Sequence, residues 1–486
     1  MSTETGEKPV IAISIIGHVD SGKSTLTGQL ALKLGGLDER TLQKLQKEAD
    51  EKNKSSFAMA FYTDKTKEER ERGVTIQTTL VKMETEKFNI TVIDCPGHAD
   101  YIKNATSGCK QSDVSIVVCP ARFEASCSSE GTLKTHLTLA AILGSKKFIV
   151  CINKIDEIDV VNDNTLKTSF DAASEAVFSL LKKLAVQRKD VIFLPISALK
   201  GIGLFKNGAT YDFYPGSPVP EKNGVTHIKT LEDAINYQDV PKRALDRPLR
   251  MPISSIAHVP GHGAVLCGRV DYGVLNKGDL VKILPIGISA KVKSIEAHKT
   301  SIPKAEAGMN IGFVLDTKDK TTVEKIKTGS IVGAGEDKDF ASYPFYTVTC
   351  MSMKKGKKGS SEPSGIKAGY TPVISCGTAN VACKFAKLLS TVDKDSKETI
   401  PNPTVIPAGQ RFDAIIYPTK QVVFEKASEF PGLGKFVCRD SGILVVAGQI
   451  TGKMTEAEAR EKYDLDISLL SGDKEALKKQ RAAKKK

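Results

Sequence analysis

The sequence of 486 residues has no long uninterrupted apolar segment, and its ten cysteines include no Cys-x-x-Cys pair. A helix that crosses a membrane needs about 20 apolar residues, so neither a transmembrane helix nor a secretory signal is expected. The cysteines are scattered, several of them inside apolar runs, which argues against a zinc site or a disulfide framework and predicts reduced, buried thiols. We therefore expect a cytoplasmic protein with no membrane partner.

The chain also lacks an internal repeat, and its length exceeds what a single core usually supports, so two to four domains are expected. Hydrophobic residues make up 40% and charged residues 26%, as in an ordinary globular protein. The net charge of +13 favours a polyanionic partner such as nucleic acid, or an acidic filament or membrane surface. A solvated basic face is an equally simple explanation.

A stretch near the start fits the phosphate-loop pattern of Gly, four residues and Gly-Lys-Ser; it reads Gly17-His18-Val19-Asp20-Ser21-Gly22-Lys23-Ser24. In such a loop, glycines let backbone N–H groups turn toward the phosphates of a nucleotide. Lys23 would reach the outer phosphates, and the Ser24 hydroxyl would be a ligand for Mg²⁺. Val10–Ile16 before the loop is typical of a buried parallel strand, and leucines at helical spacing follow it.

A charged segment, Asp64–Gly73, lies between the phosphate loop and the next strands. Alone, such a run is usually a solvated helix, but nucleotide switches carry a mobile segment at this place. Thr75 is therefore a candidate second hydroxyl for Mg²⁺ and the γ-phosphate. The later strand Phe88–Asp94 ends in Asp-x-x-Gly, where Asp94 can hold Mg²⁺ through water and the Gly97 N–H can meet a γ-phosphate.

Two polar motifs after later strands select the base; they are Asn153-Lys154-Ile155-Asp156 and Ser197-Ala198-Leu199-Lys200. The Asp156 carboxylate can accept from N1–H and from the 2-amino group of guanine, whereas adenine has neither donor there. Asn153 can hold the loop and the base edge, and the Lys154 stem can cover the ring. The Ala198 N–H can donate to the base carbonyl. GTP and GDP are therefore the predicted ligands, with Mg²⁺.

The two halves of the chain have different patterns. Up to residue 241, apolar runs alternate with helical patterns, which predicts a mostly parallel sheet with its ligand at the carboxyl ends of the strands. Beyond about Lys242, short strands alternate with glycine turns, as in antiparallel barrels. The predicted fold class is thus α/β + β, a P-loop GTPase domain (1–241) followed by two antiparallel β-barrel domains (242–338 and 339–452). A helical, basic tail (453–486) is expected to begin with a capped helix at Thr455–Tyr463 and to end in a disordered segment.

Several longer strings lie around these motifs; they are Gly17-His18-Val19-Asp20-Ser21-Gly22-Lys23-Ser24-Thr25, Glu69-Arg70-Glu71-Arg72-Gly73-Val74-Thr75-Ile76, Asp94-Cys95-Pro96-Gly97-His98, Thr378–Phe385 and Gly434-Lys435-Phe436. Together with the Asn153 motif they resemble the elongation factor 1-alpha family of translation GTPases, and the resemblance continues to about residue 450. It implies a GTPase that binds aminoacyl-tRNA and carries it to the ribosomal A site. It also implies a guanine nucleotide exchange factor as a partner.

The resemblance implies roles for single residues of the first domain. His98 would position the attacking water once the ribosome engages, and Lys23 and Thr75 would act with it in catalysis. Val19 and Val74 resemble the apolar pair that keeps this histidine away from the nucleotide, with valine at 74 where isoleucine is usual. Because no arginine of the phosphate loop is placed as a finger, slow hydrolysis by the isolated protein is expected.

In the first barrel, Glu296, His298 and Asn310 resemble the pocket for the aminoacyl end of tRNA. A carboxylate, a neutral imidazole and an amide can hold an esterified ribose and an α-amino group without attacking the ester. A lysine group also suits contact with a phosphate backbone; it consists of Lys354, Lys355, Lys357 and Lys358. The third domain departs from the family pattern at Gly377 and at Asp440–Val445, which leaves its contacts with tRNA and exchange factor open.

Three alternatives remain. A paralogous GTPase that delivers a release or rescue factor is expected to have a long extension before the phosphate loop, and here 16 residues precede Gly17. A sulfate-activation GTPase would pair with a sulfurylase, and the basic charge weighs against it. Binding to actin filaments or other acidic polymers is compatible with the elongation role.

Overall fold

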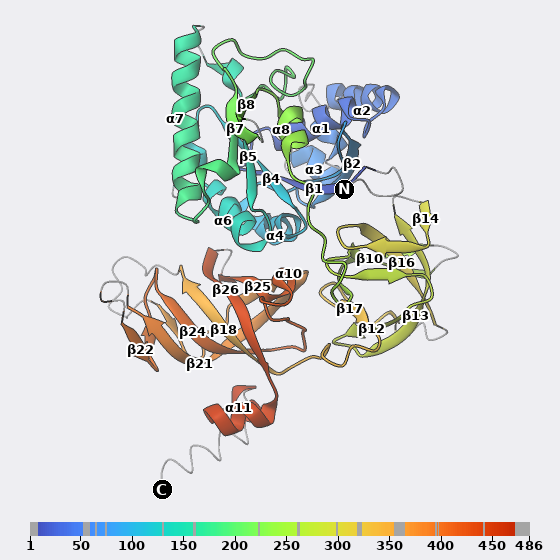
Figure 1. Cartoon of the computed structure of the whole chain (residues 1–486), viewed down its shortest axis with the longest axis vertical. Coiled ribbons are helices and arrows are strands. Elements are labelled where there is room, and N and C mark those ends of the chain that lie inside the picture. The colour runs from blue at the N-terminus through green and yellow to red at the C-terminus, as the bar shows by residue number, and fades with distance from the viewer. Residues whose placement is uncertain are drawn as a thin grey trace. The chain divides into compact units, whose positions relative to one another are not determined.

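The computed structural model describes residues 8–51, 59–63, 66–72, 75–128, 131–158, 162–221, 224–259, 263–297, 300–317, 323–353, 365–393, 396, 398–440 and 443–471. The chain forms two compact units, Met1–Lys242 and Arg243–Lys486 (Figure 1). None of the helices in these ranges is long and apolar enough to cross a membrane. Some positions singled out in the sequence lie outside the described residues, namely Val74, His298, the Lys354–Lys358 group, Ser441, Gly442 and the end of the tail.

A six-stranded sheet forms the centre of the first unit, in the order β2-β3-β1-β4-β5-β6. Its strands are β1 (Val10–Gly17), β2 (Thr79–Glu84), β3 (Asn89–Asp94), β4 (Val114–Pro120), β5 (Lys147–Asn153) and β6 (Val191–Pro195). Only β2 runs antiparallel to its neighbour; the remaining pairings are parallel. The predicted mostly parallel sheet is therefore confirmed. A separate hairpin pairs β7 (Ser217–Glu221) with β8 (Gly224–Ile228).

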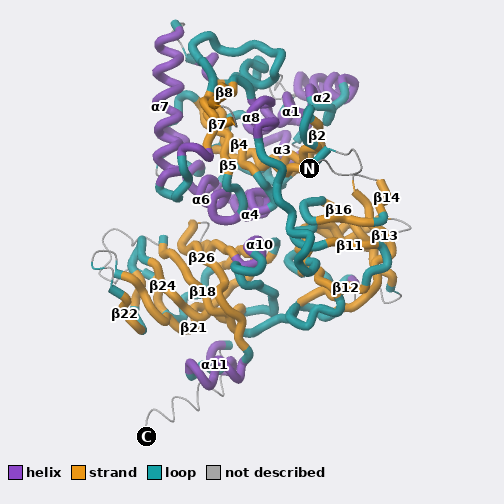
Figure 2. Tube along the Cα trace, viewed as in Figure 1, coloured by secondary structure: helices purple, strands orange, loops and turns teal. Residues whose placement is uncertain are grey.

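Helices lie around this sheet, as the purple segments of Figure 2 show. They are α1 (Lys23–Lys33), α2 (Glu39–Glu51), α3 (Lys67–Arg72), α4 (Ile102–Lys110), α5 (Glu124–Cys127), α6 (Leu133–Leu143), α7 (Asp163–Lys182) and α8 (Leu231–Tyr237). Apolar residues at helical spacing lie on the buried faces of the longer helices, as in α1, where Leu26 and Leu30 are buried. In α7, Phe170, Ala173, Val177 and Leu181 are buried. The side chain of Asn162 begins α7 by accepting from the Thr165 N–H, as an N-cap does.

A ring of four buried serine hydroxyls lies beside β1 and β4. It is made of Ser14, Ser112, Ser115 and Ser145, with O···O distances of 3.0 Å, 2.8 Å, 2.7 Å and 3.1 Å around the ring. Ser112 also donates to the Cys109 carbonyl at 2.7 Å. Each hydroxyl can both donate and accept, so the ring satisfies polar groups that burial would otherwise destabilise.

The second unit contains two closed barrels of six antiparallel strands each. The first barrel consists of β9 (Arg250–Val259), β10 (Gly263–Arg269), β12 (Leu280–Leu284), β13 (Ile288–Ala297), β16 (Asn310–Asp316) and β17 (Ile331–Ala334). The second consists of β18 (Phe345–Ser352), β20 (Val373–Cys376), β21 (Ala379–Val392), β24 (Arg411–Pro418), β25 (Lys435–Asp440) and β26 (Ile443–Met454). Each closes through one further pairing, β12 with β13 and β20 with β21. The prediction of two antiparallel barrels is confirmed.

Short elements complete the barrels; they are β11 (Val274–Asn276), β14 (Thr300–Ile302), β15 (Lys304–Glu306), β19 (Ile366–Lys367), β22 (Thr399–Pro401), β23 (Val405–Ile406) and α10 (Pro431–Gly434). The turn from β20 to β21 contains Gly377, whose φ is +62°. This left-handed conformation costs glycine less than any residue with a Cβ, which gives a local reason for glycine at position 377.

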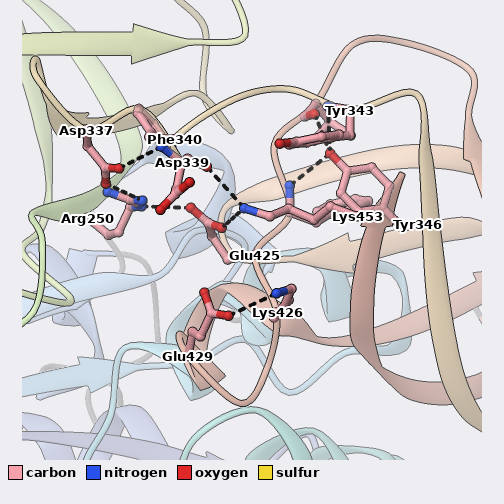
Figure 3. Close-up of polar contacts among 12 residues, drawn as sticks. Arg250, Asp337, Asp339, Phe340, Tyr343, Tyr346, Glu425, Lys426, Glu429 and Lys453 are labelled. Atoms are coloured by element: carbon pink, nitrogen blue, oxygen red, sulfur yellow. Dashed lines mark hydrogen bonds and ion pairs between the residues drawn. The ribbon is translucent and has the colours of Figure 1, made fainter. Parts of the chain in front are cut away.

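A buried ionic network joins the two barrels (Figure 3). The Arg250 guanidinium lies 2.8 Å from both Glu425 and Asp337, and Lys453 Nζ lies 2.8 Å from the other oxygen of Glu425. Arg250 and Glu425 are each 1% exposed. The guanidinium also lies between the rings of Phe340 and Phe430, at 4.3 Å and 4.7 Å from their centres. The network therefore ties the start of β9 to the segment between the barrels and to the second barrel.

Two helices after β26 pack on the outside of the second barrel; they are α11 (Glu456–Tyr463) and α12 (Ile467–Leu470). Thr455 and Glu458 form a reciprocal capping box at the start of α11, which confirms the capped helix predicted from the sequence. Ala459 and Leu465 lie in one apolar cluster with Phe345 and Ile415 of the barrel.

Candidate guanine-nucleotide site

The phosphate loop connects the carboxyl end of β1 to α1, as the motif requires. Gly22 has a φ of +93°, and a Cβ at this position would lie 2.3 Å from Asn153 Nδ2, so only glycine fits the turn. Lys23 Nζ donates to the His18 carbonyl at 2.6 Å. A Cβ on Gly97 would lie 2.5 Å from that same Nζ, which shows how closely the Asp-x-x-Gly segment approaches the loop. The structure thus brings the phosphate loop and the Asp-x-x-Gly motif close together.

A buried histidine that the sequence did not single out, His136, contacts the start of the phosphate loop. His136 Nδ1 lies 2.9 Å from the Gly17 carbonyl, and because a carbonyl can only accept, Nδ1 carries the proton. Burial, together with the nearby Lys23 charge, lowers the pKa of His136 to about 3. The imidazole is therefore neutral at physiological pH and holds Gly17 without adding charge to the phosphate loop.

This shift predicts a pH dependence of stability. Below pH 6.5 His136 is protonated in the unfolded chain, whereas in the folded chain it stays neutral down to about pH 3. The free energy of unfolding therefore falls as pH decreases. The slope from this one group is about 1.4 kcal/mol per pH unit, and the effect is absent above pH 6.5. His136→Asn, whose amide can still donate to Gly17, should give a flatter profile in urea unfolding followed by circular dichroism. Parallel profiles for the two proteins would contradict the assignment.

The residues predicted to hold Mg²⁺ are Ser24, Thr75 and Asp94. Ser24 Oγ and Thr75 Oγ1 lie 3.0 Å apart, and Asp94 is fully buried at the end of β3. Among the described residues no donor reaches hydrogen-bond geometry with either Asp94 oxygen, although the Ser24 and Thr63 hydroxyls lie near enough to favour its ionised form. Burial nevertheless raises the pKa of Asp94 to about 6. A buried carboxylate beside two hydroxyls fits a hard cation that prefers oxygen ligands.

His98 follows the Asp-x-x-Gly motif and lies at the surface, with 44% of its side chain exposed. The Asp100 N–H donates to its Nδ1 at 3.2 Å, and the Tyr101 ring lies 5.8 Å away. His18 and Gly97 are linked by Thr132, whose hydroxyl lies 2.9 Å from both His18 Nδ1 and the Gly97 carbonyl. The catalytic role of His98 stays a prediction.

The two base-selecting motifs meet at the ends of β5 and β6. Asn153 Nδ2 donates to the Ser21 carbonyl at 2.8 Å, which joins the phosphate loop to the guanine loop. Asn153 Oδ1 accepts from the Ala198 N–H at 2.9 Å, so this N–H, expected to face a base carbonyl, is engaged by Asn153 instead. The Asp156 carboxylate is 13% exposed and lies 3.3 Å from Lys200 Nζ. Leu199 is 56% exposed.

Outside this site, two predicted features can be located. The ten cysteines are all free thiols and eight of them are buried, as expected from their spacing.

In the first barrel, Glu296 lies near the end of β13 and pairs with Gly312 of β16, and Asn310 begins that same strand. The two predicted tRNA residues that the structure describes therefore lie at one end of the barrel.

The fold and the site define a class of protein. A phosphate loop after β1, a buried aspartate at the end of β3 and an Asn-Lys-x-Asp motif after β5 all lie at the carboxyl ends of a parallel sheet. This is the ligand edge expected of an open α/β sheet, and the motif set is that of a guanine-nucleotide-binding GTPase.

Comparison with known proteins extends this class to the whole chain. Residues 8–239 match the elongation factor Tu GTP binding domain, residues 263–333 match elongation factor Tu domain 2, and residues 360–451 match the GTP-eEF1A C-terminal domain-like family. Elongation factor 1-alpha of Encephalitozoon cuniculi is 38% identical over 483 residues, which cover 99% of each chain. Elongation factor 1-alpha of Onchocerca volvulus is 38% identical over 448 residues, or 91% of this chain and 94% of the relative.

The chain therefore belongs to the elongation factor 1-alpha family, and it is a GTPase of translation that binds guanine nucleotides. Two solved structures share the fold at lower identity. The GTPase-like domain of S. cerevisiae Ski7 has a TM-score of 0.71 at 17% identity, covering 92% of this chain and 98% of that chain. Elongation factor SelB of Methanococcus maripaludis has a TM-score of 0.60 at 19% identity, covering 93% and 81%.

Proposed function

We propose that the GTP-bound protein binds aminoacyl-tRNA in the cytoplasm and delivers it to the ribosomal A site, where the ribosome triggers GTP hydrolysis. The observation that carries this proposal is the length of the match, since the identity to elongation factors 1-alpha extends through both barrels and covers 99% of each chain in one relative. A protein that shared only the GTPase reaction would need only the first unit. A guanine nucleotide exchange factor, which would restore GTP after hydrolysis, is part of the same proposal.

The first barrel supports the tRNA part. The exposed Glu296 carboxylate and the Asn310 amide are diagonal neighbours across β13 and β16, about 7–8 Å apart by sheet geometry. Asn310 Nδ2 is buried and has no hydrogen-bond partner in the described part of the chain. A carboxylate can accept from the α-amino group of an esterified amino acid, and a buried amide N–H can donate to an oxygen of the same ligand.

Catalysis would depend on the phosphate site. Mg²⁺, when bound, would neutralise charge on the outer phosphates. Ser24 and Thr75 would hold it directly and Asp94 through water, while Lys23 would leave the His18 carbonyl to contact the phosphates. Phosphoryl transfer to water then needs mainly an oriented water molecule and stabilised charge.

The test is a filter or gel assay of complex formation with charged and uncharged tRNA, in the presence of GTP or GDP. Stable complex only with charged tRNA and GTP is the expected result. Equal affinity in both nucleotide states, or no preference for charged tRNA, would contradict delivery. Rapid GTP turnover without ribosomes would contradict the external trigger.

His98→Ala should separate binding from catalysis. His98 is exposed, and among the described residues its Nδ1 contacts Asp100 and not the phosphate loop, so GTP affinity should stay within about twofold of the wild type, which is less than 0.5 kcal/mol. Ribosome-stimulated hydrolysis should fall by about 10² to 10⁴, the usual contribution of a positioned acid–base group. Single-turnover hydrolysis with programmed ribosomes measures this, and Asp100→Asn is the neighbouring control. An unchanged rate would remove His98 from the mechanism.

A further inference from the structure

A buried glutamate organises the segment around Thr75. Glu69 lies in α3 and is 1% exposed. Its Oε1 accepts from the N–H groups of Ile76 at 2.9 Å and Gln77 at 3.0 Å. Its Oε2 accepts from the N–H and the hydroxyl of Thr66, both at 2.9 Å. One carboxylate thus binds the start of its own helix and the two residues that follow Thr75.

The electrostatics agree with an ionised carboxylate at this place. Burial alone would raise the pKa of Glu69, but the N–H groups of Gln77, Thr66 and Ile76 outweigh burial, and the pKa is lowered. Hydrogen bonds to an ionised acceptor are stronger than those between neutral groups. The contact with Ile76 and Gln77 is therefore present at neutral pH.

Other contacts hold the same segment from two more directions. Asn104 of α4 donates to the Ile76 carbonyl at 2.7 Å, and Thr79 donates to the Thr63 carbonyl at 3.0 Å. Thr75 itself is 7% exposed, and its hydroxyl reaches Ser24. The backbone on the carboxyl side of Thr75 is thus fixed at Ile76, Gln77 and Thr79, and Glu69 supplies the charged part of this support.

We propose that Glu69 is a positioning residue of the GTPase site, which holds the Thr75 hydroxyl beside Ser24 by binding the Ile76 and Gln77 N–H groups. Glu69 touches neither nucleotide nor metal in this proposal; it acts through Thr75. The inference rests on the proposed Mg²⁺ site and is independent of tRNA delivery. It predicts that Glu69 matters for nucleotide binding only where Mg²⁺ takes part.

Glu69→Gln tests this with little change of shape. Glutamine keeps one carbonyl oxygen, and an NH₂ group, which donates, replaces the other carboxylate oxygen. That NH₂ group must face either the Ile76 and Gln77 N–H groups or the N–H and hydroxyl of Thr66, so one pair of donors loses its acceptor. The affinity for GTP is expected to fall about tenfold in Mg²⁺ and to stay unchanged in EDTA. Hydrogen exchange at the Ile76 and Gln77 amides is expected to become faster. Glu68→Gln is the matched control, because Glu68 is 58% exposed on the same helix and pairs only with Arg72 at the surface among the ion pairs described; it should change neither quantity.

A double-mutant cycle with Thr75→Ala decides whether Glu69 acts through Thr75. In the Thr75→Ala background, Glu69→Gln should have no further effect on Mg²⁺-dependent affinity, because coupled residues are not additive. Equal loss of GTP affinity with and without Mg²⁺, unchanged amide exchange, or full additivity would each overturn the proposal.

If Glu69→Gln does not fold, Glu69→Asp keeps the charge but has a shorter side chain, and the same Mg²⁺-specific loss of GTP affinity is expected of it. Ser24→Ala tests the Mg²⁺ site itself. If this variant loses no GTP affinity specifically in Mg²⁺, the assignment of the metal site is wrong, and hydrogen exchange at the Ile76 and Gln77 amides is then the test of the role of Glu69.

Discussion

Asp156→Asn is expected to weaken GTP binding by about 10⁴-fold and to improve binding of XTP. The Asp156 carboxylate is 13% exposed and lies at the end of β5, where it can accept from both N1–H and the 2-amino group of guanine. An asparagine there presents an NH₂ group to one of these donors, which leaves a desolvated donor unpaired. Xanthine has an oxygen in place of the 2-amino group and can accept from that NH₂. Titration with fluorescent GTP and XTP measures both affinities.

The neighbouring Glu157→Gln is the control for this exchange. Glu157 is 56% exposed and lies 3.5 Å from Lys154, so its loss should leave the preference for guanine unchanged. Equal weakening for GTP and XTP in Asp156→Asn would mean that Asp156 supports the loop and does not select the base.

Glu425→Gln is expected to lower the free energy of unfolding of the second unit by about 3–5 kcal/mol. The change removes the charge that Arg250 and Lys453 share, and Arg250 is 1% exposed between two aromatic rings. Asp337 still pairs with Arg250 in this variant, but it is then the single carboxylate for two cations of the described network, so one buried positive charge is left without a counter-ion, and such a loss exceeds that of a surface pair. Urea unfolding of wild type and variant measures the difference.

Glu429→Gln provides the comparison at the surface. Glu429 pairs with Lys426 at 3.2 Å but is 51% exposed (Figure 3), so its loss should cost less than about 1 kcal/mol. If both variants lose the same stability, the ionic network does not hold the barrels together.

The sequence predicted the parts of the fold and site whose residues are close in the chain. The phosphate loop and the Asn-Lys-x-Asp motif need fixed residue types at fixed spacing, and the strands before them have continuous apolar runs. The capping box at Thr455 is likewise a local pattern, and the structure contains it.

Contacts between distant residues could not be predicted in this way. Arg250 and Glu425 are 175 positions apart, and neither belongs to a motif that would predict the other as its partner. His136 looks like one polar residue in an apolar helix until the fold brings it to Gly17, 119 positions away. Glu69 was part of a charged run that, taken alone, is typical of a solvated helix. Burial and the partners of these groups follow from tertiary packing, which periodicity does not reveal.

Strand β26 shows a different limit. The apolar run Ile443–Ala447 is followed by Gly448 and Gly452, and glycine weakens a strand, yet β26 continues to Met454. A Cβ on Gly448 would lie 2.7 Å from Cys350 Sγ and 2.8 Å from the Phe436 ring, so this glycine is there to let the barrel close around large side chains.

The packing of α11 and α12 has a practical consequence for where the chain can be shortened or fused. Phe345 and Ile415 of the second barrel are fully buried in the cluster that Ala459 and Leu465 complete, and Lys384 and Lys387 donate to the carbonyls of Leu470 and Tyr463. Removal of everything after Met454 would uncover apolar strand surface, the kind that drives aggregation. A recombinant protein cut after Ser471 keeps both helices, and an affinity tag attached there would leave the barrel covered.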